Sequence, residues 1–387
     1  MKKLLLYTLT ALFALPAFAE ITGNGYYRVQ NAYTKRYAYL TDNKGSYSVS
    51  SSTADVGALQ LYADPERVVS DPASVFFVEE APQGNYYYDI FGQGTSIHSF
   101  MNEYLSVYPY RKPYDGVTAY SIYATKSGVV KYLGDIWDHP DQDEGLASAD
   151  ASGDPSRWFF HPIEADSDQY FGVAPSIEAE GKFYAPMFAG FPFSAYSDGI
   201  KFYTISEVDS RGAAIIAEVE GTVPASTPVI IECSTSQPSS NRLNVGGKAE
   251  KISGNMLKGV YFDNPLTNRH YNRTPFDQET MRLLGVTAEG RPAFVRGDYE
   301  FIPRNQAYLQ LTDPAQYSVD EFILMTSEER EAEFNAVSVI PASETVSVYS
   351  LDGRLVKAGV SKADVPSLGK GMYILRSADS SEKMIVR

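Results

Sequence analysis

The feature that most constrains the fold is the recurrence of short aromatic segments separated by Gly, Pro and polar turns. The chain contains 29 Tyr and 20 Phe among 387 residues. Aromatic side chains favour the pleated, half-buried surface of a β-sheet. We therefore predict an all-β protein, whose length is sufficient for two or three domains.

Three segments in the first part of the chain share a Tyr-rich strand, a turn and a Tyr-Leu strand. They begin at Tyr26, Tyr88 and Tyr120. The pattern resembles the ricin-type β-trefoil, in which three such units pack around a pseudo-threefold axis. The resemblance implies a β-trefoil-like domain over residues 20–166. An irregular barrel or sandwich of similar Tyr-rich strands is the alternative.

A polar stretch at residues 164–169 separates this part from a run of short apolar strands with Gly and Pro turns. Many short strands at such spacing favour an antiparallel β-sandwich or barrel, here over residues 167–326. Cys233, the only cysteine, follows an apolar strand pattern, so we predict a small buried side chain and not a nucleophile. The predicted strands are 202–205, 213–219, 228–233, 257–262, 281–286, 293–295, 307–311 and 322–325.

The N-terminus has the pattern of a secretory signal peptide. A basic start at Lys2 and Lys3 precedes an apolar run and the small-residue site Ala17-Phe18-Ala19. We assign residues 1–19 to this signal. The run is short for a bilayer span, and no later segment offers about 20 apolar residues. The sequence therefore predicts an exported protein without a transmembrane segment.

The C-terminus carries three ordered blocks: V-x-V-Y-x-x-x-G-R-x-V, then K-G-x-Y-I-L, then a short basic and apolar tail. This order resembles the C-terminal sorting domain of type IX secretion cargo in Bacteroidota, over residues 343–387. The resemblance implies contact with the secretion machinery and a location at the cell surface or outside the cell. A plain pair of terminal β-hairpins is the alternative, and a charged run before it predicts a linker at 327–342. The residues expected to form the sorting signal are Gly353, Arg354, Gly371, Tyr373 and Lys383.

Charge and composition exclude several classes of partner and cofactor. The formal charge of −15 argues against nucleic acid, because a phosphate-binding face needs an excess of Lys and Arg. One Cys and four His leave little material for a zinc site or a disulfide framework. We expect no cofactor. Calcium is left open at the acidic stretch 135–145, which has enough oxygen ligands but not the EF-hand spacing.

The same acidic stretch suggests a ligand site. Trp137 lies beside Asp135 after the Tyr-Leu strand of the third segment, and Asp42 and Asn43 occupy the equivalent point of the first. In trefoil lectins a sugar sits at this position, stacked on an aromatic ring and held by an Asp. An aromatic platform with a hydrogen-bonding carboxylate is physically suited to a sugar. We expect these four residues to bind the ligand.

Catalytic motifs are missing from the sequence. It contains no Gly-x-Ser-x-Gly elbow, His-Glu-x-x-His or phosphate-binding glycine loop. The leading hypothesis is thus a non-catalytic surface or secreted protein that binds an extracellular glycan. A structural or adhesive protein that contacts other surface proteins is one alternative. A secreted glycan-processing enzyme with two facing carboxylates is the other.

Overall fold

The computed structural model describes residues 20–41, 59–82, 87–93, 95–96, 104–109, 114–126, 129–136, 141, 143–145, 147–149, 153–263, 273–317, 319–335, 344–377 and 381–386. The chain forms two compact units, Met1–Leu324 and Met325–Arg387. Within the first unit we call residues 20–166 the N-terminal module and residues 167–324 the middle module. The predicted signal peptide lies outside the described residues.

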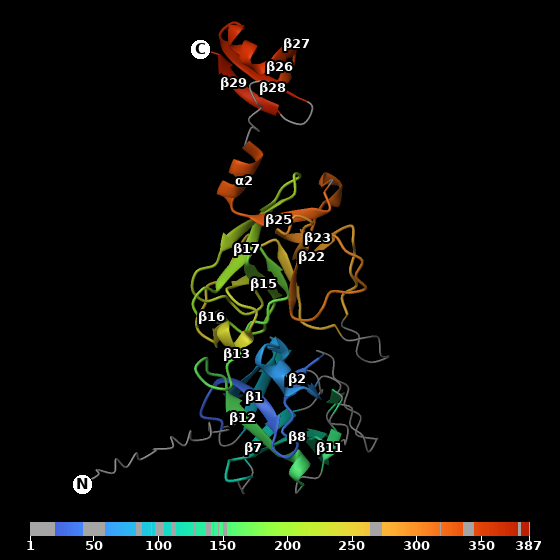
Figure 1. Ribbon diagram of the computed structural model, residues 1–387. Helices are drawn as coiled ribbons and strands as arrows, with labels where there is room; N and C mark the ends of the chain where they lie inside the picture. The colour runs from blue at the N-terminus through green and yellow to red at the C-terminus, as the bar shows by residue number, and fades with distance from the viewer. Residues whose placement is uncertain are drawn as a thin grey trace, which may run out of the picture. The chain divides into compact units, whose positions relative to one another are not determined.

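The all-β prediction is confirmed (Figure 1). The strands of the N-terminal module are β1 Gly25–Asn31, β2 Ala38–Leu40, β3 Leu59–Leu61, β4 Phe76–Glu80, β5 Tyr88–Gly92, β6 Thr95–Ser96, β7 Tyr104–Pro109, β8 Tyr120–Lys126, β9 Val129–Gly134, β10 Glu144–Gly145, β11 Ala147–Ala149 and β12 Trp158–Pro162. Within the described residues, nine of them form a sheet in the order β11-β9-β8-β12-β1-β4-β5-β6, with β7 beside β8. A second sheet has the order β10-β3-β2.

Strand β1 is the centre of this module. It pairs with β4 on one side and β12 on the other, so the first and last strands of the module lie together. Tyr27 and Val29 pack into a core with Trp158 and Phe160, as the alternation of a strand requires. Arg28, between them, points to the opposite face and is nevertheless fully buried. The threefold symmetry of a trefoil stays a prediction, because several of the connecting segments fall outside the described residues.

The middle module supplies a larger sheet. Its strands are β13 Phe171–Gly172, β14 Ile177–Ala179, β15 Lys182–Met187, β16 Phe193–Ala195, β17 Lys201–Val208, β18 Ala213–Glu218, β19 Val229–Cys233, β20 Arg242–Val245, β21 Leu257–Val260, β22 Met281–Val286, β23 Pro292–Val295, β24 Gln306–Gln310 and β25 Glu321–Met325. Ten strands follow the order β14-β15-β19-β17-β18-β25-β23-β22-β24-β21, counted over the described residues, and β13-β20-β16 form a smaller sheet. Strands β15 and β24 also approach each other, so the large sheet curls around its core.

Each strand predicted for this module is present, with shifts of one or two residues at the ends, except that β17 extends three residues further, to Val208. Cys233 is buried, as predicted, and burial followed by the charge of Glu232 raises the pKa of its thiol to about 12. Strand β15 was not predicted because Pro186 interrupts its pattern. Pro186 pairs with Ile230 but lies beyond the end of β14, where β15 has one paired neighbour and tolerates the missing N–H.

The second unit contains a helix and a sheet. Helix α2, Ser327–Asn335, forms from the charged run that predicted a linker. Its start is a capping box, in which Thr326 and Glu329 each accept a hydrogen bond from the backbone N–H of the other. The sheet has the order β27-β26-β28-β29. These strands are β26 Thr345–Ser350, β27 Leu355–Ser361, β28 Gly371–Arg376 and β29 Ser381–Val386.

The residues of the expected sorting signal lie on this sheet and its turns. Gly353 has a φ of +80°, which the β26–β27 turn requires, and Arg354 beside it is exposed. Gly371 begins β28, where the Tyr373 hydroxyl donates to the carbonyl of Gly369 over 2.7 Å. Lys383 is exposed on β29. Their sorting role stays a prediction.

Candidate functional site

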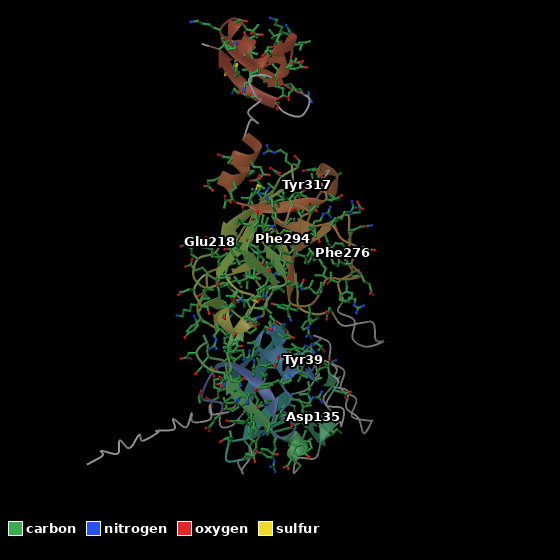
Figure 2. The ribbon with its side chains drawn as sticks, in the orientation of Figure 1. Tyr39, Asp135, Glu218, Phe276, Phe294 and Tyr317 are labelled. Atoms are coloured by element: carbon green, nitrogen blue, oxygen red, sulfur yellow. The ribbon has the colours of Figure 1, made fainter. Side chains whose placement is uncertain are left out.

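Of the residues expected to bind a ligand, Asp42, Asn43 and Trp137 lie outside the described residues. Asp135, labelled in Figure 2, is described, and its side chain is buried. Its carboxylate accepts a hydrogen bond from the Thr34 hydroxyl and lies 3.7 Å from a guanidinium nitrogen of Arg36. The attraction to the Arg36 cation offsets part of the desolvation cost of burying the carboxylate. The structure therefore places Asp135 where it ties the β1–β2 turn to the end of β9, away from open solvent.

The carboxylates of the acidic stretch 135–145, where we considered a calcium site, form ion pairs with different arginines. Asp143 binds Arg67, whereas Asp135 binds Arg36. Among the described residues, no group of three or more His, Cys, Asp or Glu side chains lies close enough to hold a metal ion. The part of this chain that the structure describes also has no helix long and apolar enough to cross a membrane. Residues 137–140 and 142 fall outside the description, so the calcium prediction is not tested.

A cleft of about 280 Å³ lies where the N-terminal module meets the middle module. Its lining combines polar groups, including two arginines, with apolar side chains, several of them from β15. The lining residues are Arg67, Ser70, Asp71, Pro72, Val173, Ala174, Ala185, Pro186, Met187, Arg304, Asn305 and Gln306.

Two short 3₁₀ helices shape the side of the cleft that belongs to the N-terminal module. They are η1 Pro65–Val69 and η2 Pro72–Ser74. Each begins with Asp-Pro: the Asp side chain accepts a backbone N–H of the first turn, and Pro occupies a position that needs no donor. This local chemistry holds Asp71 at a fixed place on the cleft wall.

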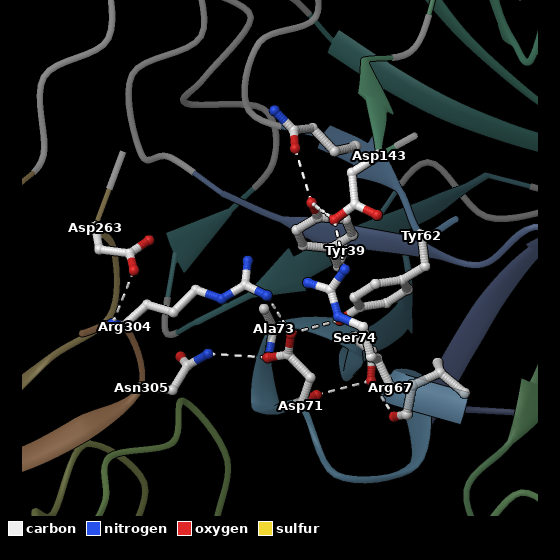
Figure 3. A network of polar contacts seen from close by, with 12 residues as sticks. Tyr39, Tyr62, Arg67, Asp71, Ala73, Ser74, Asp143, Asp263, Arg304 and Asn305 are labelled. Atoms are coloured by element: carbon white, nitrogen blue, oxygen red, sulfur yellow. Dashed lines mark hydrogen bonds and ion pairs between the residues drawn. The ribbon is translucent and has the colours of Figure 1, made fainter. Parts of the chain in front are cut away.

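Asp71 joins the two modules (Figure 3). One of its oxygens accepts hydrogen bonds from the Ala73 N–H and the Asn305 amide, both at 3.0 Å. The other accepts from the Tyr62 hydroxyl at 2.7 Å and from Nη2 of Arg304 at 2.6 Å. Burial lowers the pKa of Arg304, but the charge of Asp71, together with smaller contributions from Tyr62, Tyr39 and Asp263, outweighs this and holds that pKa above its usual value. The carboxylate thus has four donors, two of them from the middle module.

Asn305 and Gln93 meet across the same contact in an unusual backbone conformation. Their φ angles are +58° and +49°, in the left-handed region that residues other than glycine rarely adopt. The Gln93 amide donates to the Asn305 side chain, and its oxygen accepts from the backbone N–H of Gly190. Residues held in this conformation concentrate at binding sites, where surrounding contacts offset the cost.

A stacked pair of buried tyrosines lies behind the arginines and does not itself line the cleft. The rings of Tyr39 and Tyr62 are 4.1 Å apart between centroids and nearly parallel. The guanidinium carbon of Arg304 lies 4.8 Å from the Tyr39 centroid, and that of Arg67 lies 5.9 Å from it. Burial and then Asp143 raise the pKa of the Tyr39 hydroxyl far above its usual value, so this side chain stays a neutral donor. The Tyr39 ring therefore supports both guanidinium groups by cation–π contact.

Arg67 is held by Asp143 on the outer side of the cleft. Its Nη1 donates to Oδ2 of Asp143 over 2.7 Å, and Oδ1 accepts the backbone N–H of Ala63. Burial raises the pKa of Asp143, but these bonds and one from Tyr39 lower it below its usual value overall. The Arg67 side chain remains 42% exposed, so it is accessible to a ligand.

A second contact between the modules is made by Arg28, which does not line the cleft. The Arg28 guanidinium donates to the carbonyls of Val68, Gln169 and Tyr170 at 3.2, 2.6 and 2.9 Å. Burial lowers its pKa to about 10, the largest effect among those acting on it. Arg28 therefore fastens the start of the middle module to β1 through neutral groups.

Sequence reasoning missed the cleft. Asp71 and Arg304 are 233 positions apart, and no spacing rule connects them. The repeated Asp-Pro at residues 64–65 and 71–72 was the one local signal, because it marks two helix starts close together. No protein-family model matches the chain, and no curated protein is significantly similar to it.

Proposed function

We propose that this protein is an exported, non-catalytic carbohydrate-binding protein and that its cleft between the modules holds the sugar. The observation that carries the proposal is the mixture of polar and apolar groups around one cleft. Its lining includes the guanidinium and amide groups of Arg67, Arg304 and Gln306 together with the apolar side chains of Val173 and Pro72. A sugar ring has hydroxyls at its edge and C–H groups on its faces, so it suits such a site.

The size of the cleft supports a small ligand or one end of a longer chain. Its volume of about 280 Å³ is at the lower limit of typical ligand pockets. The predicted signal peptide and the likeness of residues 343–387 to a sorting domain support an extracellular setting, where glycans are abundant. Export and surface location remain part of this proposal.

The carboxylates of the cleft support binding without catalysis. A glycosidase needs two carboxyl groups that face each other across the bond that is cleaved. Among the described residues that line the cleft, Asp71 is the acidic one. All of its usual acceptor positions are taken by protein donors. A carboxylate so engaged is poorly suited to accept or deliver a proton.

A glycan array probed with the purified full chain tests the proposal, with calcium and with chelator. We expect reproducible binding to one glycan class. Arg304→Gln should weaken that binding at least tenfold. Arg211→Gln is the matched control, because Arg211 is an exposed residue of the same module and does not line the cleft.

A blank array from folded protein would refute carbohydrate binding. Unchanged affinity in the Arg304→Gln protein would place the sugar elsewhere. Loss of binding in chelator would return attention to the acidic stretch 135–145 as a calcium site.

A further inference from the structure

We infer that the ligand is an acidic saccharide, and that its carboxylate binds between the guanidinium groups of Arg304 and Arg67. This inference rests on the proposed function and names the class of sugar that the cleft selects.

The first step is an inventory of unused donors. Arg304 uses Nη2 for Asp71, and within the described residues its Nε and Nη1 make no hydrogen bond. Arg67 uses Nη1 for Asp143, and over the same described residues its Nε and Nη2 make none. Both side chains line the cleft. Each arginine therefore has two nitrogens left for a ligand, since a guanidinium has five N–H donors.

The two carboxylates beside the arginines are already engaged by protein donors. Asp71 accepts two hydrogen bonds on each oxygen. Asp143 accepts from the Ala63 N–H, from Tyr39 and from Arg67. The hydrogen-bonding capacity that remains for a ligand is therefore rich in donors, which favours a group that only accepts.

The two cations lie close together. Both are within 6 Å of the Tyr39 ring centroid, and Figure 3 shows their guanidinium groups reaching toward each other below that ring. Burial and, to a smaller extent, the charge of Arg304 lower the pKa of Arg67, and the hydrogen bond and charge of Asp143, together with Tyr39, more than offset them. A negative group placed between them would relieve the remaining repulsion.

Among anions, a carboxylate fits best. Guanidinium and carboxylate are planar and can form two parallel N–H···O bonds, which adds geometric selectivity to the charge attraction. The sugar ring that carries this carboxylate would then lie toward the apolar side chains of Pro72, Val173 and Met187. A uronic or sialic acid unit has this combination of one carboxylate, several hydroxyls and a C–H face.

Isothermal titration calorimetry on the full chain tests the inference with matched probes. These are oligosaccharides of galacturonate, of glucuronate and of sialic acid, each compared with its carboxyl-reduced form and with a sulfated neutral oligosaccharide. We expect at least one acid to bind tenfold or more tightly than its reduced form. Arg304→Gln and Arg67→Gln should each remove that preference, and Arg211→Gln should preserve it.

The outcomes separate this inference from the proposed function. Equal affinity for an acid and its reduced form, or binding to neutral or sulfated sugars alone, would overturn the carboxylate inference but leave carbohydrate binding intact. Absence of binding to every probe and to the glycan array would overturn both. Arg67→Gln guards against a folding artefact, because the Arg67 side chain is partly exposed and its ion pair should contribute little to stability.

Discussion

Two arginines at the contact between the modules have opposite surroundings. Arg28 is completely buried, and its guanidinium is satisfied by three backbone carbonyls. Arg304 borders the cleft, binds one carboxylate and keeps two nitrogens without hydrogen bonds in the described part of the chain. Burial lowers the pKa of Arg28 to about 10, whereas Asp71 raises that of Arg304.

These different surroundings suit Arg28 to a structural role and Arg304 to binding a ligand. Neutral carbonyls accept the hydrogen bonds of Arg28 but do not cancel its charge. Because the side chain is completely buried, none of its donors can reach a ligand. A carboxylate partner keeps Arg304 charged and in place while part of its fork faces the cleft. The largest effects on stability should therefore come from Arg28, and the largest effects on binding from the cleft.

Arg28→Met should have the greatest effect on stability. It leaves three buried carbonyls without a donor, and we expect the free energy of unfolding to fall by about 3 to 5 kcal/mol. Chemical denaturation measures this, with Arg211→Met as the control. A loss below about 1 kcal/mol would contradict a structural role for Arg28.

The pH dependence of stability comes next. Burial, then the charges of Arg28 and Lys35, lower the pKa of His161 to about 4. The unfolded state, with a pKa near 6.5, binds the proton first, so stability present above pH 6.5 is lost as pH falls toward 4. The loss attributable to His161 should reach about 3 kcal/mol at pH 4.

The His161→Gln protein should lack this part of the acid sensitivity, as measured by denaturation at several pH values from 7 to 4. Identical pH profiles for the two proteins would rule out the contribution. Arg28→Met sharpens the comparison, because removal of the nearby positive charge should move the pKa of His161 upward and shrink the effect.

Asp71→Asn should cost about 2 kcal/mol, because an amide cannot accept from all four donors and leaves Arg304 without its counter-charge. A double-mutant cycle with Arg304→Gln should show a coupling of at least about 1 kcal/mol. Additive effects, measured by chemical denaturation, would mean that this pair does not join the modules energetically.

Arg67→Gln should have the smallest effect on stability. Its ion pair with Asp143 is partly exposed, and such pairs contribute less than about 1 kcal/mol. The same substitution should remove the preference for acidic sugars in the calorimetric comparison. A large loss of stability with unchanged sugar preference would reverse the roles that we assign to Arg67 and Arg28.

Local patterns predicted the strands, but they could not predict which side chains meet. Alternation and turns are encoded by neighbours in the chain, so β22 was located to the residue. Asp135 illustrates the limit: an acidic loop suggests exposure, whereas its partner Thr34 lies 101 positions away and helps to hold the carboxylate inside. The cleft could not be predicted from the sequence for the same reason, since the residues that line it come from both modules.

The bond between Asn305 and Gln93 has a consequence for the history of this chain. Each module holds a residue of the other in a backbone conformation that it would rarely adopt alone. Recombination that exchanged only one module would leave the other with a strained loop. It would also remove the carbonyls of Gln169 and Tyr170 that accept hydrogen bonds from Arg28. The two modules should consequently be inherited as one cassette, and the cleft between them along with it.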